Sequence, residues 1–424
     1  MHRTFIFLFF VACLSNVSTV FAQTKEHVAA LSKALADKDL DGVHAAVAAV
    51  RLAFKHKAGV PEEPDEFRRV PAGSLLLTRD EAKQGFSLHF HTLEKMRWWK
   101  VGLDPTKLTS PLRGPASVIT GNVAAFRAQL DGAEQSLEVA KDAAEFLMWA
   151  QSQAGSGVYP FPAAVGTSDA RAMEVATKFL ADAQKAGKID EVVRNGWAFD
   201  DFGAGGLQFD NGECGVAMFE LYEITNDPRH LESARRAADW AVQRPLCTNW
   251  NYNSFSVYLL AKAYAVTKDT SYLDSTILKT RIGVIPGQLT DGPHAGRWID
   301  PHNARPAYHY IMMRALAQLA AVMRQDHPNR AEVMSSLTLG LKARNTEMVS
   351  RGVMTKDHAT EALILVNRLF AGDTVFMHET KSCEALAAIG QLISAEFRRR
   401  KPPLSPGPWG LYLEFIATAP ATQE

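Results

Sequence analysis

Apolar residues at positions i, i+3 and i+4 recur along this chain in segments of about 12 to 18 residues. Long runs that alternate apolar and polar residues are scarce. The first pattern is typical of amphipathic helices and the second of strands. The chain is therefore predicted to be all-α.

Two of these helical segments repeat one another. Residues 221–233 (LYEITNDPRHLES) align with residues 263–275 (AYAVTKDTSYLDS), a spacing of 42 residues. Each copy predicts a helix that runs into Thr-x-Asp and a second helix that begins directly after it. Asp227 or Asp269 can cap that second helix, and Pro228 suits its first turn. A repeat of this length is the mark of stacked helical hairpins.

Further hairpins follow the same pattern. The matching segments are residues 137–146 with 231–240, residues 317–344, and residues 358–370 with 381–397. The connections between hairpins are long and unlike each other, whereas an open solenoid has short connections of even length. We therefore predict an (α/α) toroid of repeated hairpins over residues 73–400, with an irregular N-terminal segment.

The two ends of the chain differ from its body. Arg3, an apolar core and the small-residue site at 20–22 predict a signal peptide over residues 1–22, and export to a periplasm or beyond. No later segment is apolar over about 18 residues, so no transmembrane helix is expected. Residues 23–72 predict Ala-rich helices and a linker. Residues 401–424 predict a proline-rich tail, of which residues 401–408 cannot continue a helix and residues 409–416 can pack back on the body.

Composition narrows the possible partners. Lys and Arg number 46, Asp and Glu also 46, and 47% of residues are hydrophobic. A neutral chain without a basic excess does not predict nucleic-acid binding. Cys214, Cys247 and Cys383 lack C-x-x-C spacing, so no metal cluster is predicted. Cys214 and Cys383 are expected as buried thiols, with a disulfide left open; no oligomeric state is indicated.

Unusual residues gather in the connections, where a helical scaffold carries function. Residues 195–213 combine glycines and aromatics with the carboxylates of Asp200, Asp201, Asp210 and Glu213. Paired carboxylates suit acid and base roles in glycoside hydrolysis, or they can bind Ca²⁺ through oxygen ligands. Helix capping by Asp210 is the structural alternative.

A second cluster, residues 247–253 (CTNWNYN), joins three asparagines to two aromatic rings. Trp250 and Tyr252 suit stacking on sugar rings, and the amide of Asn253 can donate to a carboxylate. Capping of the next helix is the structural alternative.

The third cluster, residues 294–309 (HAGRWIDPHNARPAYH), is the densest in polar and aromatic side chains. It holds Trp298, His302, Arg305, Tyr308 and His309. Zinc is not predicted here, because the segment has neither His-x-His nor an i, i+4 histidine pair. A structural network of hydrogen bonds is the alternative.

The pattern Tyr-x-x-Thr-x-Asp-x-x-Tyr/His-Leu in repeated hairpins resembles secreted carbohydrate-active enzymes with (α/α) toroid folds. These include six-hairpin glycosidases, unsaturated-glucuronyl hydrolases and toroid polysaccharide lyases. Residues 209–211 (FDN) are similar to the Asp-Asn-x-Ala-Thr helix opening of toroid pectate lyases, but Glu213-Cys214 replace Ala-Thr, so only Asp210 and Asn211 carry over. The resemblance spans residues 129–344 and implies a saccharide substrate without naming the reaction.

We expect a secreted polysaccharide lyase that cleaves uronate-containing polymers by β-elimination. That reaction needs a carboxylate partner, a base and an acid. The expected roles are acid or base for Tyr308, His309 and, in reserve, His302; carboxylate neutralisation for Arg305 and Asn253; and substrate binding for Trp250, Tyr252, Trp298, Asp200, Asp201, Asp210 and Glu213.

Two alternatives remain open: a glycoside hydrolase that uses the carboxylates of residues 200–213, and a glycan-binding protein without catalysis. All three loops precede the first helix of a hairpin. Asp210, Asn253 and Arg305 are therefore predicted to line one cavity at the same end of the ring.

Overall fold

The computed structural model describes residues 25–53, 67–86, 112–154, 157–159, 161–162, 185, 193–194, 198–199, 206–298, 308–354, 358–400 and 404–418. Helices dominate these residues, and each named strand within them is two residues long. The all-α prediction is confirmed.

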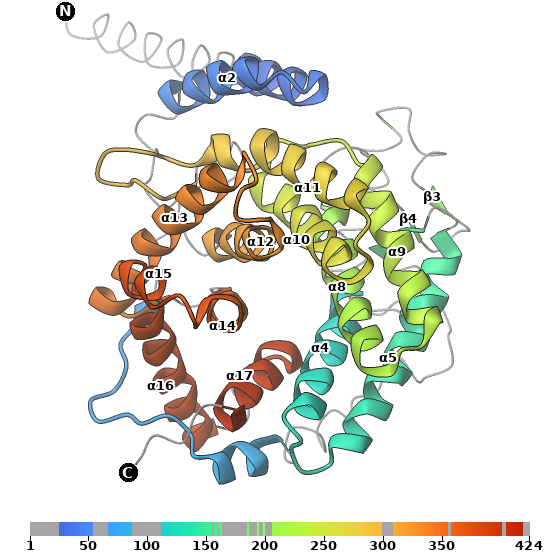
Figure 1. Ribbon diagram of the computed structural model, residues 1–424, viewed down its shortest axis with the longest axis vertical. Coiled ribbons are helices and arrows are strands. Elements are labelled where there is room, and N and C mark those ends of the chain that lie inside the picture. The colour runs from blue at the N-terminus through green and yellow to red at the C-terminus, as the bar shows by residue number, and fades with distance from the viewer. Residues whose placement is uncertain are drawn as a thin grey trace, which may run out of the picture.

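The helices form two concentric layers (Figure 1). Within the described residues, the inner layer consists of α4 (Arg113–Arg127), α8 (Leu207–Thr225), α10 (Trp250–Thr267), α12 (His309–Val322), α14 (Ala359–Phe370) and α17 (Pro406–Thr418). The outer layer consists of α5 (Ala133–Ala154), α9 (Pro228–Gln243), α11 (Thr270–Gly283), α13 (Arg330–Arg351), α15 (Thr374–Glu379) and α16 (Ser382–Arg400). Among the described helices, inner and outer ones alternate up to α14, as a series of hairpins requires; two outer helices, α15 and α16, then precede the inner helix α17.

The inner layer closes into a ring. Each inner helix contacts the next, and the last, α17, packs against the first, α4 (Figure 1). Gly410 of α17 and Gly121 of α4 let the two backbones approach closely: a Cβ atom built on Gly410 lies 2.3 Å from the carbonyl oxygen of Gly121. The predicted (α/α) toroid is confirmed, and an open solenoid is excluded.

The predicted repeat corresponds to α8–α9 and α10–α11. Asn226 and Lys268 end the inner helices in the left-handed conformation, with φ of 52° and 61°. The side chains of Asp227 and Asp269 then cap the outer helices, each accepting a hydrogen bond from the backbone N–H two residues later. The repeated Thr-x-Asp turns therefore perform the capping predicted from the sequence.

Burial separates the two layers. Most residues of the inner helices α8, α10 and α12 are buried, including nearly the whole first half of each. The outer helix α9 buries one alanine-rich face and exposes the other. A helix covered on all sides must be apolar nearly all round, whereas a helix at the surface needs only one apolar stripe.

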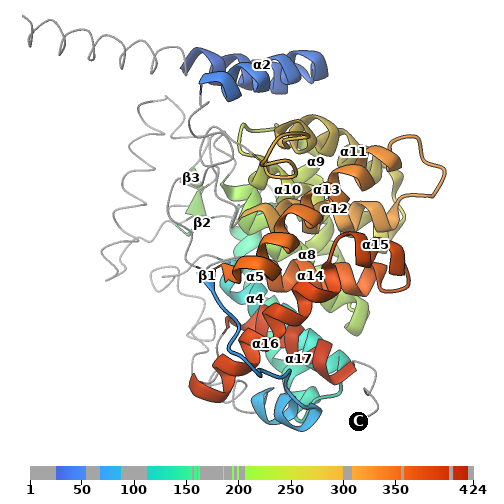
Figure 2. The ribbon, with the colours of Figure 1, turned by 90° about the vertical axis from the view of Figure 1, so that its left-hand side faces the viewer.

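The N-terminal part of the chain packs on the outside of the ring. Helix α2 (Leu40–Ala53) lies against α11 and the short 3₁₀ helix η3 (Ile285–Gly287), at the top of Figure 2. A guanidinium nitrogen of Arg51 donates to the carbonyl oxygens of Pro286 at 3.1 Å and Gln288 at 2.7 Å.

Short strands make two small sheets. Strand β1 (Phe67–Arg68) pairs antiparallel with β5 (Val353–Met354). The strands β2 (Phe161–Pro162), β4 (Ala198–Phe199) and β3 (Val193–Arg194) pair antiparallel in that order.

The tail predicted for residues 401–424 needs correction, because residues 406–418 form the inner helix α17. Pro406 and Pro408 lie in its first turn, where a missing N–H removes no intrahelical hydrogen bond. Trp409 and Tyr412 are buried against the ring. The proline-rich segment therefore begins a helix that completes the toroid.

Cys214, Cys247 and Cys383 are free thiols, and the first two are buried. The expectation of a buried thiol is wrong for Cys383, which is exposed. None of the helices in the described part of the chain is long and apolar enough to cross a membrane. The predicted signal peptide, residues 1–22, lies outside the described residues.

Candidate functional site

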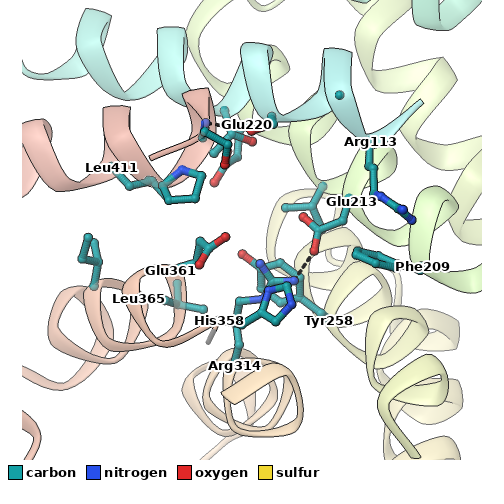
Figure 3. A pocket seen from close by; sticks show the side chains of 18 of the residues that line it. Arg113, Phe209, Glu213, Glu220, Tyr258, Arg314, His358, Glu361, Leu365 and Leu411 are labelled. Atoms are coloured by element: carbon teal, nitrogen blue, oxygen red, sulfur yellow. Dashed lines mark hydrogen bonds and ion pairs between the residues drawn. The ribbon is translucent and has the colours of Figure 1, made fainter. Parts of the chain in front are cut away.

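A cavity of about 360 Å³ lies inside the ring and is lined by all the inner helices (Figure 3). Several lining residues lie in the first two turns of these helices. They include Arg113 at the start of α4, Glu213 on α8, Glu361 on α14 and Gly407 on α17. The N-terminal ends of the inner helices therefore contribute part of the cavity lining.

A buried ion pair forms one wall of the cavity. Arg314 of α12 donates to the carboxylate of Glu213 on α8, and its guanidinium lies 4.5 Å from the ring centroid of Tyr258. Burial lowers the pKa of Arg314, but Glu213, Tyr258 and Glu361 together outweigh burial, and the net pKa is raised. Arg314 is therefore a fixed positive charge beside the phenol of Tyr258.

A second arginine, Arg113, joins α4 to α8. Its backbone N–H and a guanidinium nitrogen both approach the carboxylate of Asp210, at 3.4 and 3.3 Å. Its guanidinium also covers the ring of Phe209 at 4.4 Å from the centroid. Burial raises the pKa of Asp210 to about 6, against the opposing effect of Arg113. Asp210 thus caps α4 from the neighbouring helix α8, and Arg113 rather than Asp210 lines the cavity.

A histidine lines the cavity near the ion pair of Arg314 and Glu213. His358 is the residue before α14, and Glu361 lies in the first turn of the same helix. Figure 3 shows both side chains at the cavity, near Arg314. Burial lowers the pKa of His358, although Glu361 opposes the shift. The imidazole is therefore neutral at pH 7. Tyr308 lies behind it, with the two ring centroids 6.5 Å apart.

The structure places most of the described predicted residues away from this cavity. Asn253 is fully buried, where it accepts from the backbone N–H of Cys247 and donates to the carbonyl oxygens of Cys247 and Gly283. The role of carboxylate partner predicted for Asn253 is corrected accordingly. Its position fixes the turn between the layers, because a buried amide needs all its hydrogen bonds.

Three ring-bearing residues of the second and third clusters are also structural. Trp298 is buried and donates to the carbonyl oxygen of Val284 at 2.9 Å. His309 is buried with Nε2 lying 3.1 Å from the carbonyl oxygen of Trp298, and burial lowers its pKa well below the ordinary value. Trp250 is 1% exposed. The predicted acid or base role of His309 and the stacking roles of both tryptophans are corrected, because saccharide cannot reach side chains inside the packed layers.

The remaining predictions divide into two groups. Tyr252 is half-buried and does not line the cavity. Asp200, Asp201, His302 and Arg305 lie outside the described residues. Glu213 is thus the predicted site residue that the cavity contains.

The possible Ca²⁺ site stays a prediction, because Asp200 and Asp201 lie outside the described residues. In the described residues, no group of three or more His, Cys, Asp or Glu side chains is placed to hold a metal ion.

The sequence reasoning missed Arg314, Tyr258, His358 and Glu361. One signal could have found Arg314, which is the only Lys, Arg, Asp or Glu residue in the apolar helix α12. A single charge on a helix buried all round needs a partner or a cavity. The other three carry no comparable signal, because their contacts come from separate hairpins.

No protein-family model matches this chain, and no curated protein matches it. Solved structures do match it. A polysaccharide lyase has a TM-score of 0.44 at 14% identity, covering 80% of this chain and 96% of its own. A glycosyl hydrolase family 88 protein from Bacteroides vulgatus has a TM-score of 0.45 at 13% identity, covering 80% and 98%. A GH127 beta-arabinofuranosidase has a TM-score of 0.44 at 13% identity, covering 84% and 61%.

At these identities the likeness concerns the fold alone. The TM-scores are too low for the likeness to carry an argument, so the (α/α) toroid itself rests on the closed ring of inner helices.

Proposed function

We propose that this protein is a secreted enzyme that acts on a uronate-containing polysaccharide and cleaves it by β-elimination in the ring cavity. The observation that carries the proposal is the meeting of an imidazole, a phenol and guanidinium groups, from His358, Tyr258, Arg113 and Arg314, at one cavity. This set supplies the base, the acid and the cations that the reaction requires.

The two proton-transfer groups have complementary states. Burial lowers the pKa of His358, so the neutral imidazole can accept a proton. Burial raises the pKa of Tyr258, against the effect of Arg314, so the phenol keeps a proton to donate. His358 would remove the proton from C5 of the uronate. The electron pair of the C5–H bond would then form the C4–C5 double bond as the C4–O bond breaks. The leaving oxygen would take its proton from Tyr258, and solvent would then restore both groups.

The electrostatics of the cavity favour an anionic sugar near the N-terminal ends of the inner helices. Among the described residues, three arginines and three glutamates line the cavity, so their formal charges balance: Arg113, Arg314, Arg368, Glu213, Glu220 and Glu361. The N-terminal ends of α4, α8, α14 and α17 add positive partial charge to this part of the cavity. Arg113 is only partly buried and is the guanidinium best placed to meet the uronate carboxylate.

Absorbance of an unsaturated uronyl product tests the proposal on pectate, alginate, ulvan and glycosaminoglycans. We expect the wild type to generate this product on at least one of them. Y258F and H358A should reduce the rate about 10²- to 10⁴-fold, the usual contribution of a general acid or base. Y264F and H44A are matched controls, because Tyr264 lies outside the cavity on the same helix α10, and His44 is exposed on α2. No absorbance rise with any of these polymers would refute elimination.

Hydrolysis is the second candidate, favoured by a separate observation. Glu213 and Glu361 project toward the same cavity from different helices (Figure 3). Two carboxyl groups flanking a glycosidic bond are the usual machinery of glycoside hydrolysis. In that case E361Q would abolish the release of reducing ends, wild-type products would lack unsaturation, and H358A would retain activity.

A further inference from the structure

The cavity has two polar layers. On three inner helices its lining residues recur seven positions apart: Arg113 and Thr120, Glu213 and Glu220, and Glu361 and Arg368. Seven residues are about two helical turns, so each pair shares a helix face and is separated by about 10 Å along the axis. The first members form the outer layer at the helix N-termini. The second members form the inner layer, two turns further along the helices.

Tyr258 lines the cavity, and charged groups of both layers act on its hydroxyl. The charges that act on its hydroxyl come from Arg314 and Glu213 in the outer part of the cavity, and from Glu220 and Arg368 in the inner layer. A saccharide with its reacting bond at Tyr258 would therefore have sugar units in both layers.

The inner layer contains a carboxylate, Glu220, with one oxygen that lacks a hydrogen-bond donor among the described residues. Arg368 donates to Glu414 of α17 at 2.7 Å, so Glu414 balances its charge. Glu220 is 7% exposed, and its Oε2 atom accepts no hydrogen bond from any described residue. A buried carboxylate oxygen without a donor is unfavourable. Hydroxyl groups of a bound sugar are donors that can satisfy it.

We propose that the inner layer is a second sugar subsite in which Glu220 accepts hydrogen bonds from the hydroxyl groups of a neutral sugar unit. A uronate in this subsite would place a second carboxylate beside Glu220, and like charges repel. The preferred substrate is thus a polymer in which uronates alternate with neutral sugars, rather than a homopolymer of uronates. This inference rests on the proposed function, which supplies the uronate in the outer layer.

Calorimetric binding of size-defined oligosaccharides tests the inference, with the H358A background to stop turnover. The ligands are one tetrasaccharide with alternating uronate and neutral units and one made of uronates alone. We expect E220Q to weaken binding of the alternating ligand about 10-fold or more, as for a lost hydrogen bond to a charged group. Because glutamine removes the repulsion, E220Q should bind the uronate-only ligand more tightly.

E223Q is the matched control. Glu223 lies on the same helix but faces the surface, where it pairs with Arg127 and Lys262. It should leave both affinities unchanged. Equal binding of both ligands by E220Q and by the protein with Glu220 would overturn the inference alone. Binding of neither ligand, together with no elimination by the wild type, would overturn the proposed function and this inference with it.

Discussion

Closure of the ring can be tested at one contact between the first and last inner helices. A Cβ atom on Gly121 would lie 2.2 Å from the carbonyl oxygen of Pro406, and one on Gly410 would lie 2.3 Å from the carbonyl oxygen of Gly121. These obstacles are backbone atoms, so they cannot move aside by changing rotamer. Either substitution by alanine must push α17 away from α4.

The magnitude follows from two opposing effects. Overpacking costs about 1–3 kcal/mol, and backbone obstacles place this site near about 3 kcal/mol. Replacing a helical glycine by alanine restores about 1 kcal/mol of helix propensity. We therefore expect G121A and G410A each to lower the free energy of unfolding by about 2 kcal/mol. Because the two glycines touch, the double variant should depart from additivity.

Urea unfolding followed by circular dichroism measures this free energy. G372A is the matched control, since a Cβ at Gly372 meets no atom within 4 Å, and its stability should stay within about 0.5 kcal/mol of the wild type. Activity on the responsive polymer should fall in G121A and G410A, because α4 and α17 both line the cavity. Wild-type stability in both glycine variants would refute the close approach of these helices.

Two further predictions concern buried charge. R314M should lower the free energy of unfolding by about 3 kcal/mol, the low end for breaking a buried ion pair, since the partner carboxylate is partly exposed. R324M, which breaks an exposed ion pair, should change this free energy by less than about 0.5 kcal/mol. Equal effects of the two substitutions in urea unfolding would contradict the reasoning. Asp210 has a folded-state pKa of about 6 against an ordinary 3.8, so its protonated form favours folding and this stability is lost as the pH rises from about 4 to about 6. D210N should therefore lose up to about 3 kcal/mol less stability than the wild type over that range, and parallel stability–pH curves would refute the shift.

Local structure was predictable because it depends on neighbours in the sequence. The turns at Asp227 and Asp269 need only a left-handed residue, a capping carboxylate and the first turn of the next helix. Their recurrence 42 residues apart indicated hairpins, and hairpins of this kind must stack. The all-α class and the toroid followed from these features.

The cavity could be predicted only in part. Dense clusters of polar and aromatic residues suggested a site, yet Asn253, Trp298 and His309 are buried between layers and hold the turns together. Composition alone does not distinguish a side chain that binds a ligand from one that satisfies buried backbone groups. Both need the same donors and acceptors.

The sequence by itself determined the hairpins, their caps and the layered helical class, because these arise from contacts within about 40 residues. The tertiary structure alone decided which helix faces line the cavity. Tyr258, Arg314 and His358 lie on separate hairpins, and their meeting depends on the rotation of each helix and on closure of the ring. Closure itself depends on α17. Its prolines predict a tail, but Gly410 packs against α4 and makes it the last inner helix. The packing of α17 against α4 leaves little periodic signal in the sequence, because it depends on one close approach of two backbones.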